Sequence, residues 1–431
     1  MNLQNNYPTI TLHNFGPISD FHFSIRKFNI LTGPQAGGKS TVAKSVLFCH
    51  TVKNELVTQL TLPLDESRYH LPARMGIKKR LRNKFLRTFG STWSMSSDMR
   101  IVYEYCPDIS VTICLVDDKD HPGKNFVEFI FSDKIRDFLS VKERESYPDV
   151  ESIILFHKEA DQLFNDYYDS IYIPAGRGMI TLLTDQLNYI FSSSNDVIPS
   201  TIDHCTRQYV EKILQLRPLF TGGLQGLLED KLHLTQEIID KEKAYLLLDL
   251  ASRVLKGQYY YSSGEERLSI SDDRFVKINY ASSGQQEAVW IFNLLFYYLL
   301  NKKQVFLILE EPEAHLFPEA QLNIAKALGL FQEVQNRVLV TTHSPYLLGA
   351  FNNMLYADKI PEDKLLKTTS MRPEYVLHPS ETTAYYMDDG AISDAMDHGL
   401  IQNELIDNAS EMINTENDQL MNLFWKGNQN E

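Results

Sequence analysis

Apolar and polar residues alternate over residues 9–31, which predicts two short strands around the Gly16-Pro17 turn. The second strand leads into a glycine-rich loop. Apolar residues then recur at helical spacing from Val42 to about residue 60, and Pro63 ends this pattern. The start of the chain is therefore expected to fold as two strands, a loop and a helix.

The middle of the chain switches between strand and helix patterns. Residues 101–131 alternate as three strands, and a charged helical stretch follows them. Residues 170–173 predict one more strand. Residues 201–256 have helical periodicity that is broken at Thr221-Gly222-Gly223, which predicts a helical pair, and residues 259–280 return to strands.

Two short and mainly apolar runs, 305–309 and 337–342, are continuous rather than alternating. Continuous runs of this length are typical of parallel strands that are buried on both faces. An apolar helix over residues 288–300 precedes the first run. We therefore predict an α/β fold around a buried parallel sheet.

Composition and charge narrow the class of protein. The chain has 431 residues, of which 43% are hydrophobic and 23% charged, as in ordinary globular proteins. Its net charge of −14 excludes a protein that coats nucleic acid with its whole surface. No secretory signal and no apolar run of about 20 residues are present, so we expect a cytoplasmic protein without a membrane segment. The four scattered cysteines are expected to be buried free thiols.

The glycine-rich loop carries the first chemical signal. It follows an apolar strand, opens a helix, and has the spacing of a phosphate-binding (Walker A) loop. Its backbone N–H groups and helix N-terminus would surround the phosphates of ATP, Lys39 would reach the β- and γ-phosphates, and Ser40 would bind Mg²⁺. The predicted ATP-binding residues are Gly33, Pro34, Gln35, Ala36, Gly37, Gly38, Lys39, Ser40 and Thr41.

Polar side chains follow each of the two buried runs. Glu310 and Glu311 end the first run, and His343 follows the second. At the carboxyl edge of a parallel sheet, Glu310 could hold Mg²⁺, Glu311 could activate the attacking water, and His343 could bond the γ-phosphate. The turn Ser282-Ser283-Gly284-Gln285 presents hydroxyl and N–H groups at the start of a helix. Each feature alone has an ordinary structural explanation, but their order and spacing together indicate one site.

This order of motifs resembles the ABC-type ATPase domain, with Walker A, signature, Walker B and switch histidine. The segments Ser-Ser-Gly-Gln-Gln, Glu-Glu-Pro-Glu-Ala-His-Leu-Phe-Pro and Thr-Thr-His-Ser-Pro are similar to the overcoming-lysogenisation-defect (OLD) ATPases of the SMC/RecF-like branch. The resemblance covers residues 9–60 and 275–350. It implies a head-to-head dimer or higher oligomer that holds ATP and Mg²⁺ between two copies. Ser282, Ser283, Gly284 and Gln285 would then act in trans, with Glu311 as catalytic base and His343 as switch.

The chain departs from the family pattern at three points. Glu310 stands where the usual Walker B residue is aspartate, and Ser283 replaces a glycine in the signature. No glutamine of a Q-loop can be assigned, and Gln59 and Gln186 are only candidates.

Two cationic features have open interpretations. Arg177 follows a predicted strand in a Gly-Arg-Gly turn, where it could aim at a phosphate edge or lie in an exposed turn. Seven cations lie between residues 74 and 87 of an acidic chain and could contact DNA, RNA or an acidic partner, or pair with acids elsewhere in the fold. They are Arg74, Lys78, Lys79, Arg80, Arg82, Lys84 and Arg87.

The end of the chain is strongly acidic. Residues 381–431 contain eleven Asp or Glu residues against one Lys, a net charge of −10. Asp388, Asp389, Asp394 and Asp397 are expected in turns and helices rather than in a nuclease site. The segment from Leu400 onward reads as an amphipathic acidic helix that could dock on the chain's own surface or on a neighbour.

The expected organisation is a P-loop ABC-type ATPase head with an inserted antiparallel β lobe, a helical insertion and an acidic C-terminal helical segment. Its parts are the ATPase core (1–62), an inserted lobe (63–168), a return strand (169–200), a helical insertion (201–256), the second half of the core (257–360) and the acidic segment (361–431).

The resemblance implies a slow, regulatory ATP hydrolase. The chain is similar to the stand-alone ATPase subunits of the PARIS and Septu anti-phage systems, which implies a sensor or scaffold that controls a separately encoded nuclease effector. Its trigger could be DNA or an acidic phage protein. The alternative is a DNA-repair or chromosome-maintenance ATPase that contacts DNA through residues 74–87, and a transporter ATPase is a weaker third interpretation.

Overall fold

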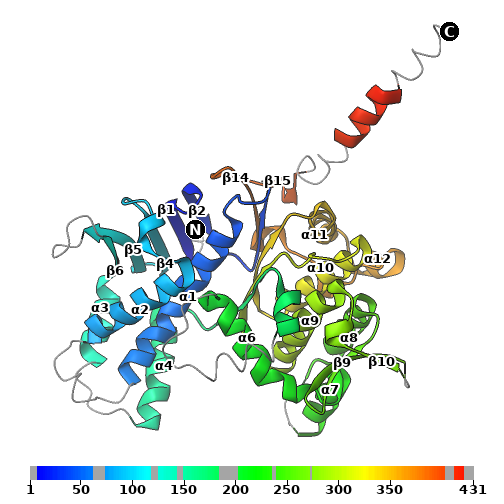
Figure 1. The fold of residues 1–431 in the computed structure, drawn as a ribbon, viewed down its shortest axis with the longest axis horizontal. Helices are drawn as coiled ribbons and strands as arrows, with labels where there is room; N and C mark the ends of the chain where they lie inside the picture. Colours follow the sequence, from blue (N-terminus) through cyan, green and yellow to red (C-terminus); the bar gives the residue numbers. More distant parts are fainter. Residues whose placement is uncertain are drawn as a thin grey trace.

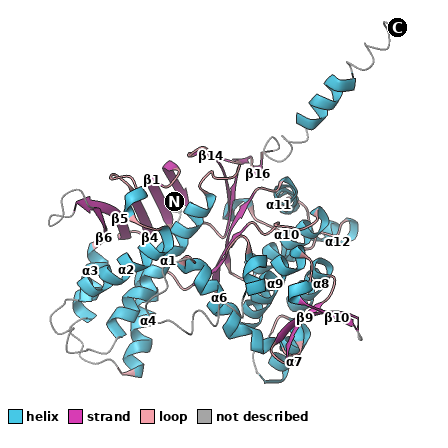
Figure 2. Cartoon of the chain, in the orientation of Figure 1, coloured by secondary structure: helices cyan, strands magenta, loops and turns pink. Residues whose placement is uncertain are grey.

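A six-stranded sheet lies at the centre of the protein, between two sets of helices (Figure 1 and Figure 2). The computed structural model describes residues 7–61, 73–117, 125–142, 149–183, 202–234, 239–271, 274–402 and 412–421. Five strands run parallel, and β14 pairs antiparallel with β13 at one edge. The sheet order is β14 (Ala391–Asp394), β13 (Thr382–Asp388), β3 (Phe28–Thr32), β12 (Arg337–Thr342), β11 (Val305–Glu310) and β7 (Asp169–Ile173).

The continuous apolar runs form central strands because both of their faces are buried. In β11, Leu307 and Leu309 join one hydrophobic core, while Phe306 and Ile308 join the other. The first core is shared with α9 (Ser283–Asn301), α10 (Pro318–Glu333) and α11 (Pro345–Ala357), and the second with α1 (Lys39–Thr61). The predicted buried parallel sheet is confirmed.

A second, antiparallel sheet has the order β2-β1-β4-β5-β6. Its strands are β1 (Thr9–Phe15), β2 (Ile18–Ser24), β4 (Arg100–Cys106), β5 (Ile109–Asp117) and β6 (Asn125–Phe131). The expectation of two strands before the phosphate loop is wrong. The β1–β2 hairpin belongs to this second sheet, and a third strand, β3, feeds the loop, because the chain leaves the hairpin after Ser24. Helices α2 (Ala73–Phe89), α3 (Asp133–Lys142) and α4 (Val150–Phe164) complete this part of the molecule.

Residues 202–280 hold three helices rather than the expected pair. They are α6 (His204–Leu216), α7 (Gly223–Leu234) and α8 (Lys241–Leu255), and Thr221-Gly222 separates only the first two. A small antiparallel sheet follows, made of β8 (Gln258–Ser262), β9 (Glu265–Ser271) and β10 (Arg274–Lys277). The last expected strand ends at Lys277 because Ile278–Tyr280 forms a 3-10 turn that leads into α9.

The acidic end of the chain begins with a short helix, α12 (Glu362–Thr368), and then enters the central sheet. The expected turn-and-helix setting is wrong for three of the four aspartates and is confirmed only for Asp389. Asp388 ends β13 and Asp394 ends β14, Asp389 lies in the turn between them, and Asp397 lies in β15 (Met396–Asp397), which pairs with β16 (Leu400–Ile401). Residues 412–421 are helical, as predicted, and project away from the body in Figure 1.

Candidate active site

The phosphate loop connects β3 to α1 at the carboxyl edge of the central sheet. Gly33 and Gly38 adopt positive φ angles of 133° and 96°, and Ala36 has a φ of 62°, so the loop needs its glycines to close. The Lys39 ammonium donates to the carbonyls of Gly33 at 2.9 Å and Pro34 at 2.6 Å. The Lys39 side chain therefore folds back onto the start of the loop that connects β3 to α1.

Strand β13 packs against the phosphate loop, and the sequence did not predict this strand of the central sheet. A Cβ atom on Gly33 would lie 2.0 Å from the Met387 carbonyl oxygen, and one on Gly37 would lie 2.6 Å from it. No side chain fits at either position. The glycines thus leave room for the backbone of a neighbouring strand.

The charges of three carboxylates act on the Lys39 ammonium. Burial lowers the pKa of the Lys39 ammonium, and the charges of Glu311, Glu313 and Glu310 oppose this shift. The cation is thus under the influence of three acids that lie at the end of β11 and in the turn after it. A basic group among acids is an arrangement that suits a ligand carrying both phosphates and a divalent cation.

Glu310 and Ser40 are the residues that could hold Mg²⁺. Burial raises the pKa of Glu310, and the Ser40 hydroxyl, the charge of Lys44, the Tyr172 hydroxyl and the Ala175 N–H group oppose the rise. The Glu310 Oε1 atom is buried and has no hydrogen-bond partner. An unpartnered carboxylate oxygen near a serine hydroxyl is a hard donor set that fits Mg²⁺, whose other ligands are usually water and phosphate.

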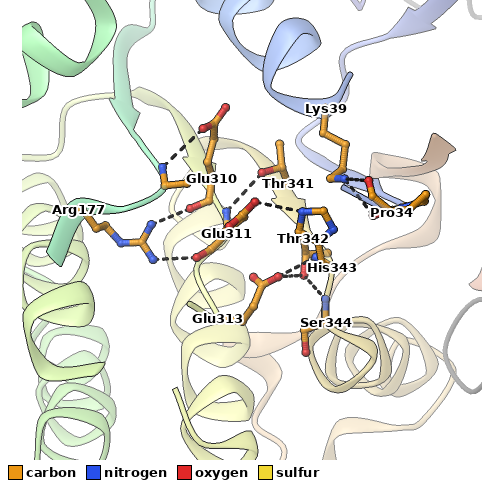
Figure 3. Close-up of polar contacts among 12 residues, drawn as sticks. Pro34, Lys39, Arg177, Glu310, Glu311, Glu313, Thr341, Thr342, His343 and Ser344 are labelled. Carbon is orange, nitrogen blue, oxygen red and sulfur yellow. Dashed lines mark hydrogen bonds and ion pairs between the residues drawn. The ribbon is translucent and has the colours of Figure 1, made fainter. Parts of the chain in front are cut away.

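Glu311 and His343 contact each other across the ends of β11 and β12 (Figure 3). The Glu311 Oε1 and His343 Nε2 atoms are 3.0 Å apart. Glu311 has a positive φ of 43°, a conformation that is unusual outside glycine and is held by its N–H bond to the Thr341 carbonyl at 2.9 Å. Both side chains remain partly exposed, so they can reach a substrate.

Glu313, which the sequence analysis did not single out, positions the histidine. Its Oε1 atom accepts hydrogen bonds from the Thr342 hydroxyl and from the His343 backbone N–H, both at 2.7 Å. The sequence offers one indication of this role, because Glu313 follows the end of β11 by only three residues in the Glu-Glu-Pro-Glu segment. Glu313 is thus a positioning residue rather than a third acid for the substrate.

The interpretation that Arg177 aims its side chain at a phosphate group is wrong. Its side chain is fully buried, and its guanidinium donates to the carbonyls of Pro174, Glu287, Glu310 and Glu311 at 2.7–2.9 Å. The Glu287 carboxylate lies 3.3 Å from Arg177 Nε. Arg177 therefore fixes the backbone beneath Glu310 and Glu311 (Figure 3).

The signature turn caps helix α9. The Ser282 hydroxyl accepts from the Gln285 N–H, and the Gln285 side chain accepts from the Ser282 N–H, which is a capping box. Gln285 also donates to the Leu255 carbonyl at 2.7 Å, so its side chain is used within the chain. A Cβ on Gly284 would lie 2.8 Å from the His315 carbonyl. Ser283 is exposed at the first helical position and is the side chain of this turn most free to meet a ligand.

The signature residues line a cavity of about 810 Å³. Its other described walls come from α8, the loop after β11 and the first half of α10, and none of them belongs to the phosphate loop. Within one chain, the signature turn and the phosphate loop of the predicted ATP site therefore do not line the same cavity.

Four of the seven cations between residues 74 and 87 have acidic partners within the fold. Arg80 and Lys84 lie 3.0 and 2.9 Å from Glu55, while Lys78 contacts Glu128 and Arg82 lies 3.6 Å from it. Arg74, Lys79 and Arg87 are exposed on α2. Pairing with acids elsewhere in the fold therefore accounts for four of the cations, and Arg74, Lys79 and Arg87 form no ion pair with an acid in the part of the chain that the structure describes.

The remaining candidates lie away from the site or outside the described residues. Gln59 is in α1, 19 residues beyond Ser40, which places it about 28 Å along the helix from that residue. Gln186 lies outside the described residues. In the described part of the chain, no three His, Cys, Asp or Glu residues cluster to hold a metal ion, and no helix there is long and apolar enough to cross a membrane.

Comparison with known proteins gives one family match. Residues 188–348 match the AAA_15 family model, described as an AAA ATPase domain. The matched range contains the signature turn, Glu310, Glu311 and His343. No curated protein matches the chain in sequence.

Similar solved structures include three SMC heads. The SMC head bound to the C-winged helix domain of ScpA is 11% identical, with 90% of this chain and 96% of that chain covered and a TM-score of 0.39. The Thermotoga maritima SMC head is 10% identical, covers 90% and 98%, and has a TM-score of 0.36. The Pyrococcus furiosus SMC head with an extended coiled coil, bound to the C-terminal domain of ScpA, is 11% identical, covers 94% and 99%, and has a TM-score of 0.36. By its sheet, its phosphate loop and its family match, this chain is an α/β protein with a P-loop ATPase domain.

Proposed function

We propose that the protein is an ATP hydrolase that binds ATP and Mg²⁺ between two copies of itself, so that nucleotide controls assembly. The observation that carries this proposal is the separation of the site's halves. The signature turn lines a cavity to which the phosphate loop contributes no described residue. A second copy brings the two halves together without any rearrangement within one chain.

Within the composite site, each residue has a distinct role in the proposal. Lys39 and the loop N–H groups hold the phosphates, and Ser40 and Glu310 hold Mg²⁺, which supplies charge stabilisation when it is bound. Glu311 orients and deprotonates the attacking water. His343 keeps Glu311 in place, while Ser283 and the N-terminus of α9 meet the nucleotide held by the other copy.

Mixing two inactive variants tests the composite site. Lys39→Ala retains an intact signature, and Ser283→Arg retains an intact phosphate loop. An equal mixture forms half of its dimers from one chain of each kind, each with one intact site, so ATP turnover should recover to about a quarter of the wild-type rate. A mixture of Lys39→Ala with the Lys39→Ala/Ser283→Arg double variant is the control and should stay inactive. No recovery in the first mixture would contradict a site shared between copies.

In its finer form, the proposal is a cytoplasmic sensor or scaffold subunit of an anti-phage defence complex that controls a separately encoded nuclease. The resemblance of its motifs to stand-alone defence ATPases supports this role. Its test is to co-purify the chain with the product of the neighbouring gene, with and without ATP. An ATP-dependent complex with a nuclease is expected, and a neighbour without nuclease activity would contradict the defence role while leaving the composite site intact.

The alternative is an ATPase that contacts DNA through α2, favoured by the exposed cations Arg74, Lys79 and Arg87. Changing these three to Glu tests it without breaking the ion pairs of their neighbours. A matched control changes the exposed cations Lys303, Lys359 and Lys367 to Glu. If α2 binds DNA, only the first variant should lose binding, together with about three units of slope in the salt dependence of affinity.

A further inference from the structure

A groove runs along α10 beyond the signature cavity. Two adjoining cavities of about 320 and 290 Å³ open between α10, α11, α12 and α8. Lys326 lines both of them, and Thr369, Ser370 and Met371 are also shared. We call these two cavities the α10 groove.

The α10 groove combines an apolar lining with the cation of Lys326, which forms no ion pair among the described residues. Leu322, Tyr356 and Leu366 line it and are 41–55% exposed. The Lys326 ammonium lies 3.4 Å from the Ser370 hydroxyl and 6.0 Å from the centre of the Tyr375 ring.

Lys326 has no acidic partner among the described residues. Asp249 also lines the groove, but its carboxylate lies 2.8 Å from Arg253. Burial lowers the pKa of Lys326, and the charge of Arg253 lowers it further. An acidic group that entered the groove would therefore stabilise the ammonium.

The helix at residues 412–421 has the complementary chemistry. Met412, Ile413, Leu420 and Met421 are 50–68% exposed. Glu416 follows Ile413 by three residues and precedes Leu420 by four, so it lies on the same face as the apolar residues. Asp418 lies on the opposite face. The apolar side of this helix thus carries one carboxylate among its apolar residues.

The chain length allows this helix to reach the groove of its own chain. β16 ends beside α11, where the Ile401 N–H donates to the Asn352 side chain at 3.0 Å. Tyr356, in the groove lining, lies one turn further along α11. Nine residues lie between Gln402 and Met412, and the ten residue steps span up to about 35 Å, while α11 itself is about 20 Å long.

We propose that the helix at residues 412–421 docks in the α10 groove of its own chain, with Glu416 beside Lys326 and the apolar residues against Leu322, Tyr356 and Leu366. The groove and the signature cavity share Leu322 and Lys326. Docking therefore competes with the approach of a second copy. This consequence rests on the proposed function, whereas docking itself does not.

Carbodiimide coupling of the full-length chain tests the docking. The reagent joins an amine to a carboxylate that touches it, so mass spectrometry should find a Lys326–Glu416 amide. Lys326→Arg keeps the charge but removes the reactive amine, and it should abolish that link. Coupling an equal mixture of ¹⁴N- and ¹⁵N-labelled chains separates links within a chain from links between chains. Links only between chains would overturn docking within one chain.

Hydrogen exchange gives an independent measurement. Glu416→Lys should speed exchange in residues 318–333 and 362–372 about tenfold, and Asp418→Lys, which changes charge equally on the opposite face, should not. The double variant Lys326→Glu/Glu416→Lys should restore protection. Equal exchange in all variants, together with no Lys326–Glu416 link, would overturn the proposal.

The competition between docking of the helix and the approach of a second copy can be measured separately. Glu416→Lys should strengthen ATP-dependent self-association, measured by sedimentation, about tenfold relative to Asp418→Lys. If the Lys326–Glu416 link forms but self-association does not change, docking stands and the competition is refuted. If no variant self-associates with ATP, the proposed composite site fails instead.

Discussion

The His343 Nε2 atom lies 3.0 Å from the Glu311 Oε1 atom, so the first residues after two adjacent buried strands contact each other directly. Parallel strands in register bring their carboxyl ends to one edge, and this register pairs Glu310 with Thr341. The contact therefore follows from the sheet and needs no flexible loop to form it.

Glu311→Gln should lower the kcat for ATP hydrolysis by about 10²–10⁴-fold and leave ATP binding intact, because it removes the base but keeps the shape of the side chain. Phosphate release and calorimetric titration measure the two effects. Glu242→Gln, in the exposed first turn of α8, is the control. Wild-type turnover in Glu311→Gln would shift the role of base to Glu310.

His343→Ala should move the acid limb of the kcat profile to higher pH. The hydrogen bond from His343 lowers the pKa of Glu311, and burial opposes this effect. Because the carboxylate is the active form of a base, activity falls as pH drops through its pKa. Loss of His343 raises that pKa, so the fall begins at higher pH. An unchanged limb would show that another group controls it.

Gly37→Ala should destabilise the protein by about 1–3 kcal/mol and abolish ATP binding, because its Cβ would lie 2.6 Å from the Met387 carbonyl. Gly226→Ala is the matched control, since its Cβ would meet nothing within 4 Å inside helix α7. That variant should be equally stable or slightly more stable. Thermal unfolding with and without ATP distinguishes the two variants.

Arg177→Lys should destabilise the fold by about 3 kcal/mol, because a lysine cannot replace the guanidinium bonds to four carbonyls. Arg136→Lys, an exposed change in α3, should have little effect. Denaturant unfolding measures both. A higher KM for ATP without a loss of stability would instead indicate that Arg177 contacts phosphate.

Asp166→Asn should destabilise the protein by about 3–5 kcal/mol at neutral pH, because His50 and Lys53 would lose a buried partner. Burial alone would raise the pKa of Asp166, but these two groups outweigh it and lower the pKa. The stabilisation is therefore complete above the unfolded pKa of about 3.9 and is lost as pH falls through the folded value.

The difference in unfolding free energy between Asp166→Asn and the wild type should therefore narrow only below about pH 4. Asp108→Asn, at an exposed ion pair with Lys134, is the control and should be near neutral at every pH. A difference that narrowed between pH 5 and 7 would contradict the assigned cause.

The sequence predicts the parts of the site whose signals are local. Glycine spacing identifies the phosphate loop, and the apolar runs before Glu310 and His343 identify strands that end at one edge. The strand β13 escaped prediction because its residues Thr382–Asp388 mix polar and apolar types, and its partner β3 lies about 350 residues away. The burial of Arg177 was not predicted because a Gly-Arg-Gly turn is typical of an exposed loop. The backbone carbonyls that accept its hydrogen bonds cannot be identified from the sequence.

The pairing of β13 with β3 also has a consequence for biosynthesis. The backbone of Met387 packs against the phosphate loop. The loop is synthesised early in translation, whereas the strand that packs against it is synthesised near the end. Contacts between such distant residues form slowly, because a long segment must first be ordered between them. The phosphate loop therefore lacks this contact until β13 has been synthesised and paired with β3.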